Sequence, residues 1–260
     1  MKIHVESGDS PLVLAQPHGG IEIPPDILRR LNDTGQALED TDWHIQRLYH
    51  GLIDKVTLVS TPLHRYVVDV NRDPSGQSLY PGQYTTSLCP TTTFDGDPIY
   101  RDGEEPGEAE IHERRQRYHQ PYHDALAEQL ERIHQKHGYV VLYDCHSIRS
   151  LIPYLFDGRL ADLNIGTNSG ASCDPGIESC VLEACAKATH YTHVTNGRFK
   201  GGWTTRHYGD PVRGYHAIQM ELVQDNYMTE KSPWAYDIDK AERLRETLRG
   251  ILLGVLAVMG

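Results

Sequence analysis

Short apolar runs of strand length alternate with longer segments of helical periodicity along most of this chain. Such runs predict strands at residues 11–16, 56–61, 66–70, 139–143 and 216–222, and the helical periods predict helices at 43–54, 108–137, 178–188 and 235–256. Strands that alternate with helices are typical of a mostly parallel or mixed sheet with helices on both faces. The predicted fold class is therefore α/β, with a central sheet flanked by helices.

Two long segments differ in regularity. In 108–137, Ile111, Tyr118, Tyr122 and Leu126 keep a three-or-four spacing, while Pro121 predicts a kink or a division of the helix. Residues 79–106 are rich in Gly, Pro and Thr, show no sustained period and predict a long loop. No internal repeat or low-complexity tract divides the chain, so we expect one domain over residues 1–260.

Charge and apolar content exclude two classes of partner. The formal net charge of −11 repels phosphate backbones and anionic membranes, so we expect no nucleic-acid partner. The longest apolar stretch, 251–259, is about half of the roughly 20 residues that span a bilayer, and we predict no membrane segment. An anionic small-molecule substrate would need local arginines to hold it. No feature of the sequence predicts an oligomeric state.

The five cysteines form no CxxC pair and are odd in number, and the N-terminus has no basic-then-apolar leader. These features predict reduced thiols and a cytoplasmic location.

Several unusual polar residues each follow or lie within a different strand-like run. His18 follows 11–16, Asn71 and Arg72 follow 66–70, His146 follows 139–143, and Glu221 lies within 216–222. Because binding sites of open α/β sheets form at the carboxyl ends of the strands, we expect these side chains to converge.

The two histidines are candidate metal ligands, since imidazole is the commonest protein ligand for metals. Asp144 lies two residues before His146, and on an extended strand both side chains point the same way, so Asp144 can orient the imidazole. Alternatives are an incidental histidine in a turn at His18 and a hydrogen-bonded core histidine at His146.

A catalytic zinc usually takes three protein ligands. The third could be Glu22, close to His18, or Asp42, at the predicted start of a helix, where it could equally be an N-cap. Spacing does not choose between them.

Glu221 lies in an otherwise apolar strand, where burial should raise the pKa of its carboxyl group. This suits it to act as a general base, and a structural salt bridge is the alternative.

Arginines beside small residues are candidates for binding substrate carboxylates through paired hydrogen bonds. They are Arg72, Arg198 and Arg206, with Asn71 and His207 as neighbouring polar candidates. Each could instead be a surface or ion-pair residue. No G-x-S-x-G or nucleotide-binding glycine motif is present, which disfavours covalent serine catalysis and a nucleotide cofactor.

Taken together, these motifs resemble the N-formylglutamate amidohydrolases, also called N-formylglutamate deformylases. The resemblance runs from about His18 to Met228 and rests on PHGG, DTDWHIQRLY, RYVVDVNR, TTFDGDPIY, PYHDAL, DCHSIRSLIPYLFDG, LNIGT, GASCDP, NGRFKGGWTTRHYGDP, HAIQMEL and Q-x-x-YM.

The resemblance implies a fold similar to the zinc carboxypeptidases and aspartoacylases, and one zinc ion per chain. It implies that His18 and His146 are metal ligands, that Glu221 is the general base and acid, and that Asn71 and Arg72 bind a carboxylate. The carboxypeptidase-like first motif is H-x-x-E, but Ile21 occupies its last position here, so we favour Asp42 over Glu22 as the third ligand.

The expected reaction is hydrolysis of N-formyl-L-glutamate to formate and L-glutamate, with a small N-formyl amino acid as the partner molecule. In this hypothesis zinc and a nearby arginine polarise the formyl carbonyl, and Arg72 is the catalytic arginine beside the general base Glu221. The alternatives are a deacylase of another N-acyl amino acid and a non-catalytic, metal-dependent binding protein.

Overall fold

A mixed β-sheet forms the centre of the protein. We describe residues 2–77, 82 and 84–259 of a computed structural model of the chain. Within these ranges, seven strands form one sheet in the order β1-β3-β2-β4-β7-β5-β6. They are β1 (His4–Glu6), β2 (Leu12–Gln16), β3 (Thr57–Ser60), β4 (Val140–Ile148), β5 (Leu163–Gly166), β6 (His193–Thr195) and β7 (Tyr215–Val223). Strands β3, β2, β4 and β7 are parallel, whereas β1 runs antiparallel to β3 and β5 antiparallel to β7.

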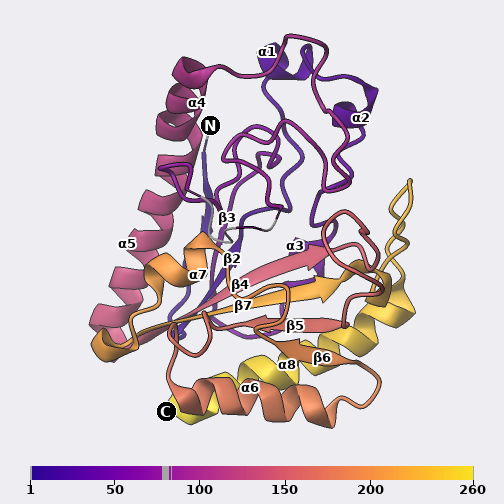
Figure 1. Cartoon of the computed structure of the whole chain (residues 1–260). Coiled ribbons are helices and arrows are strands. Elements are labelled where there is room, and N and C mark those ends of the chain that lie inside the picture. The colour runs from indigo at the N-terminus through magenta and orange to yellow at the C-terminus, as the bar shows by residue number, and fades with distance from the viewer. Residues whose placement is uncertain (1, 78–81, 83, 260) are drawn as a thin grey trace.

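Helices cover both faces of the sheet. Successive residues of a strand point to opposite faces, so each buried strand packs apolar side chains against both helix layers. In β2, Leu12 and Leu14 pack toward α3 (Ile45–Tyr49), α6 (Pro175–Lys187) and α8 (Ile238–Met259). Val13 and Ala15 pack toward α5 (Gln120–His137) on the opposite face. Figure 1 shows α6 and α8 below the sheet and α5 along its other side. The predicted fold class, an α/β sheet flanked by helices, is confirmed.

The remaining elements are short and lie outside the sheet. They are the helices α1 (Pro25–Leu28), α2 (Asp33–Gln36), α4 (Glu108–Arg114) and α7 (Trp203–Tyr208), the π turn η1 (Arg115–His119), and the 3₁₀ turns η2 (Pro211–Arg213) and η3 (Gln224–Asn226). The predicted helix 108–137 is present as α4, η1 and α5 in direct succession, and the π turn η1 ends two residues before Pro121. Proline at this position cannot donate to the carbonyl of Arg117, which lies within the π turn.

Four of the five predicted strands are present, but the prediction for 66–70 is wrong. These residues form a buried turn, with Tyr66, Val67 and Val70 packed into the core. Their apolar character reflects burial, which a short run cannot distinguish from strand pairing. The sequence analysis missed β1, β5 and β6, which are short, and β1 and β6 lie at the edges of the sheet.

The predicted loop 79–106 has no helix or strand at residue 82 or residues 84–106, while 79–81 and 83 lie outside the described residues. The five cysteines are free thiols. In the part of the chain that the structure describes, no helix has the length and apolar character needed to cross a membrane.

Candidate metal centre and active site

The carboxyl ends of three adjacent parallel strands meet at the candidate site. His18 follows β2, His146 lies near the end of β4, and Glu221 is its direct partner on β7. Because β2, β4 and β7 are neighbours in the sheet, residues distant in sequence converge at this edge. All three side chains are buried.

His18, Asp42 and His146 form a group that could bind a metal ion. The two Nδ1 atoms lie 3.1 Å apart, and Asp42 Oδ2 lies 3.3 Å from His146 Nδ1 and 3.9 Å from His18 Nδ1. A tetrahedral ion with bonds of about 2.0–2.1 Å places its ligand atoms roughly 3.3 Å from one another. The three ligand atoms therefore have the spacing that such an ion requires.

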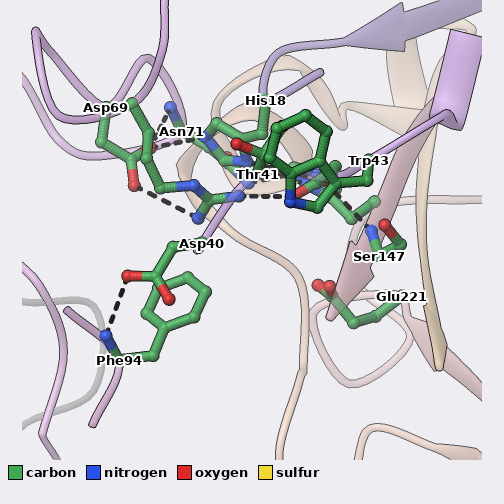
Figure 2. A network of polar contacts seen from close by, with 12 residues as sticks. His18, Asp40, Thr41, Trp43, Asp69, Asn71, Phe94, Ser147 and Glu221 are labelled. Carbon is green, nitrogen blue, oxygen red and sulfur yellow. Dashed lines mark hydrogen bonds and ion pairs between the residues drawn. The ribbon is translucent and has the colours of Figure 1, made fainter. Parts of the chain in front are cut away.

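A further carboxylate contacts the far side of each imidazole ring. His18 Nε2 donates to Asp69 Oδ1 at 2.8 Å, and His146 Nε2 lies 3.0 Å from Asp144 Oδ2 (Figure 2 shows His18 beside Asp69). With its proton on Nε2, neutral His18 turns its Nδ1 lone pair toward His146 Nδ1 and Asp42. Such an arrangement is stabilised by a cation between the three atoms, and carboxylate–histidine pairs of this kind orient metal ligands.

Asp42 is held by three contacts. Arg65 Nη2 donates to Oδ1 at 2.5 Å, the Ser147 backbone N–H donates to Oδ2 at 3.1 Å, and the Asp42 N–H donates to the His18 carbonyl at 3.0 Å. Burial alone would raise the pKa of Asp42, but Arg65 and the two histidines hold it below its usual value. Asp42 is therefore ionised, as a metal ligand must be.

Glu22 lies outside this group. Its side chain is exposed, and its backbone N–H donates to the Pro62 carbonyl. The structure thus brings together His18, Asp42 and His146, and leaves the alternative third ligand at the surface.

Glu221 has the properties expected of a proton carrier. Burial raises the pKa of its carboxyl group to about 7, an effect that the charge of His146 partly opposes. Gln219 Nε2 donates to Glu221 Oε2 at 3.1 Å, which leaves Oε1 for another partner. A carboxyl group with a pKa near neutrality can both accept and release a proton at physiological pH.

A cavity of about 270 Å³ opens onto these groups. Its lining includes both histidines, Glu221, Gln219 and several groups that can bind anions. The latter are Arg65, Asn71, Arg72 and Arg198. Its size suits a small, charged molecule.

Predicted carboxylate-binding residues fall into two sets. Arg72 Nη2 donates to Thr86 Oγ1 at 2.9 Å, and Arg198 Nε donates to the Leu155 carbonyl at 3.0 Å, so both guanidinium groups are held at the cavity wall. Arg206 Nε donates to the Gly201 carbonyl, and the exposed His207 ring stacks on Trp203 at 4.2 Å. Among the described residues, the cavity lining includes Arg72 and Arg198 but neither Arg206 nor His207.

The sequence analysis gave no role to Arg65. This side chain is 5 % exposed, contacts Asp42, lies 4.9 Å above the Phe94 ring and reaches the cavity. Phe94 is itself held by its N–H, which donates to the buried Asp40 (Figure 2). The sequence contained one signal for the role of Arg65. Arg65 and Asp69 border the apolar segment 66–68, and charged residues are rarely fully buried unless they are paired.

A buried histidine–aspartate–histidine group beside a carboxyl group of near-neutral pKa, at the carboxyl edge of an α/β sheet, is typical of hydrolases that use a metal ion. Comparison with known proteins identifies the family. A family model described as N-formylglutamate amidohydrolase matches residues 10–228, and the chain belongs to this family.

Three relatives cover nearly the whole chain. The N-formylglutamate deformylase of Pseudomonas aeruginosa is 46% identical over 256 residues, covering 96% of this chain and 94% of the relative. That of Pseudomonas putida is 43% identical over 251 residues, with the same coverage. The crystal structure of an N-formylglutamate amidohydrolase from Ralstonia eutropha JMP134 superposes with a TM-score of 0.79 at 24% identity, covering 97% of this chain and 96% of that one, which supports the fold.

Proposed function

We propose that this protein hydrolyses N-formyl-L-glutamate to formate and L-glutamate, with one zinc ion held by His18, Asp42 and His146. The observation that carries the proposal is that these three ligand atoms, 3.1–3.9 Å apart, lie beside the cavity that also contains Glu221. Two imidazoles and a carboxylate are a ligand set that suits zinc. The two Pseudomonas relatives are named for action on N-formylglutamate.

Bound zinc would supply a Lewis acid that polarises the formyl carbonyl and lowers the pKa of water to about 7. Glu221 acts as the general base, removing a proton from the attacking water. The same carboxyl group then donates that proton to the departing glutamate nitrogen, which its pKa of about 7 permits in both directions. Formate and L-glutamate are the products.

Arg65 is the arginine suited to the developing negative charge on the carbonyl oxygen. Its guanidinium contacts Asp42 and also lines the cavity, so it can reach both the metal group and a molecule bound in the cavity. Fixed donors in a buried site stabilise such a charge without reorganisation.

Two arginines and an amide at the cavity wall bind the carboxylates of the substrate in this proposal: Arg72, Arg198 and Asn71. Arg206 and His207, which lie outside the cavity lining, would act on the substrate only indirectly. We further propose that residues 1–260 form a single amidohydrolase domain and that the enzyme works in the cytoplasm.

The test is formate release from N-formyl-L-glutamate, N-acetyl-L-glutamate and N-formyl-L-aspartate, by zinc-loaded and by chelator-treated protein. We expect rapid turnover of the first substrate only, loss of turnover on chelation and recovery with zinc. Faster hydrolysis of the acetyl compound would replace the proposal with a deacylase of larger acyl groups. No turnover of any substrate by protein with full zinc content would favour a binding protein.

A further inference from the structure

Four histidines of the helix formed by η1 and α5 each contact a backbone carbonyl of another segment. His119 Nε2 donates to Arg72 O at 3.1 Å and His123 Nε2 to Val70 O at 2.7 Å. His134 and His137 donate to Arg213 O and Asp9 O, each at 2.8 Å. The first two acceptors flank Asn71, whereas the other two lie on segments that contribute nothing to the cavity lining described above.

The hydrogen bond to Val70 fixes the proton of His123. Because the Val70 carbonyl can only accept, Nε2 carries the proton, while Nδ1 lies 3.0 Å from the Tyr208 hydroxyl, which also donates to the His123 carbonyl at 3.2 Å. Burial lowers the pKa of His123 to about 3, so the ring is neutral at physiological pH. The ring also packs between Trp203 and Tyr208, with centroids 4.6 and 5.9 Å away.

Asn71 is fixed from its other side by α7. Its Oδ1 accepts from the Thr204 N–H at 2.9 Å, and its Nδ2 lies 3.1 Å from His146 Nε2. A Cβ on Gly202 would come within 2.4 Å of Asn71 Nδ2, so glycine is required there for this close approach. Helix α7 thus contacts Asn71 through Thr204 and His123 through Tyr208.

The segment 68–72 has no strand or helix pairing of its own. Its conformation depends on contacts from α5, from α7 and from the Leu88 carbonyl, which accepts from the Asp69 N–H at 2.7 Å. Within the segment, Asp69 Oδ1 accepts from the Asn71 N–H at 2.9 Å (Figure 2). Removing the bond from His123 would leave the Val70 carbonyl, immediately before Asn71, without this hydrogen-bond donor.

We propose that His123 is a positioning residue, which fixes the backbone at Val70 so that Asn71 and Arg72 meet the substrate carboxylate in the geometry needed for binding. This inference rests on the proposed function, because it takes Asn71 and Arg72 as the carboxylate-binding pair. His123 acts only through that pair, since it does not line the cavity. On this proposal, the motif PYHDAL, which contains His123, serves to position the carboxylate-binding pair.

The experiment compares three variants of the zinc-loaded protein. In His123→Leu the donor is lost at similar volume, whereas in His123→Gln an amide N–H can reach the Val70 carbonyl. His134→Leu is the matched control, because it removes the same kind of bond from the same helix at a remote carbonyl. For each variant, KM and kcat for N-formyl-L-glutamate, zinc content and Tm are measured, together with the Kd for L-glutamate by calorimetry.

For His123→Leu we expect KM and Kd to rise by about tenfold or more, with kcat and zinc content changed by less than about threefold, since small displacements of positioning groups cost up to about 100-fold. His123→Gln should recover most of the affinity, and His134→Leu should leave KM unchanged. A merely structural role would lower Tm without this selective loss of affinity.

Three outcomes overturn the inference: a Kd for L-glutamate in His123→Leu within about twofold of wild type, a His123→Gln variant as impaired as His123→Leu, or an equal rise in KM in His134→Leu. Wild-type protein that binds L-glutamate but does not hydrolyse N-formyl-L-glutamate would refute the proposed function alone. Wild-type protein that does neither would refute both.

Discussion

Replacement of Glu221 by glutamine tests whether this carboxyl group is the proton carrier. Glutamine has the same shape and can still accept the hydrogen bond from Gln219 through its amide oxygen. It cannot take a proton from water. The substitution therefore removes the chemistry of Glu221 while changing the packing very little.

The two consequences of Glu221→Gln have opposite signs. General acid–base catalysis contributes about 10²- to 10⁴-fold, so kcat should fall by that factor, which corresponds to about 3–5 kcal/mol in the barrier. Stability should rise, because burial raises the pKa of Glu221 from 4.5 to about 7. At about 1.4 kcal/mol per pKa unit, the ionised carboxylate destabilises the metal-free fold by about 3 kcal/mol above pH 7.

The sign of the pH dependence follows from linkage. For a carboxyl group whose folded pKa is raised, the folded state binds more protons than the unfolded state between pH 4.5 and about 7. The stability of the wild-type protein therefore falls through that window as pH rises. The gain of Glu221→Gln should be absent near pH 4.5 and complete above about pH 7.

The assays are formate release at saturating substrate and denaturant unfolding of chelator-treated protein at pH 4.5 and pH 8. Zinc content of the loaded variant serves as the control for an intact metal site. Unchanged kcat at full zinc content would refute the general-base assignment. A variant less stable than wild type at pH 8 would refute the reasoning about burial.

Three further predictions follow from the site and its surroundings. Zinc should raise the Tm of chelator-treated wild-type protein, because it binds the folded His18–Asp42–His146 group; a His146→Ala variant whose Tm rises equally would contradict that ligand set. Arg72→Ala should raise KM for N-formyl-L-glutamate much more than for a neutral N-formyl amino acid, by about tenfold or more, as a lost charged hydrogen bond implies; equal effects on both substrates would rule out a role in carboxylate binding. Because burial lowers the pKa of His123 from 6.5 to about 3, the unfolded state binds the extra proton in that window, and stability falls as pH falls from 6.5 to about 3. His123→Leu should reduce this slope by up to one proton, about 1.4 kcal/mol per pH unit, in unfolding measured across the window, and an unchanged slope would show that the ring is not buried in its neutral form.

The sequence alone predicted the layered arrangement of helices around a sheet, because hydrophobic periodicity is a local property of the chain. Residues 11–16 and 216–222 were predicted as strands close to the observed bounds of β2 and β7, and 108–137 as one long helical segment. The appearance of polar residues at the ends of these runs predicted where His18, His146 and Glu221 would converge, since parallel strands align their carboxyl ends.

Which of the candidate residues come together depends on distances in the folded chain, and no local sequence pattern contains those distances. Asp42 and Glu22 were equally suitable by spacing, and only the path of the chain after β2 brought Asp42 to the histidines and left Glu22 exposed. Likewise, Arg72, Arg198 and Arg206 had similar sequence surroundings, but only the first two line the cavity. Arg65 was missed because its importance comes from the aspartates around it.

The apolar segment 66–70 shows the same division between local pattern and tertiary structure. Its sequence determined that it is buried, and the tertiary structure decided that it is a turn, held by hydrogen bonds from Arg114 to Val67 O and from His123 to Val70 O. Burial is favoured because apolar side chains are transferred out of water, and each residue makes its own contribution to that free energy. The conformation of a buried segment follows from which groups satisfy its backbone carbonyls, and those groups come from distant parts of the chain.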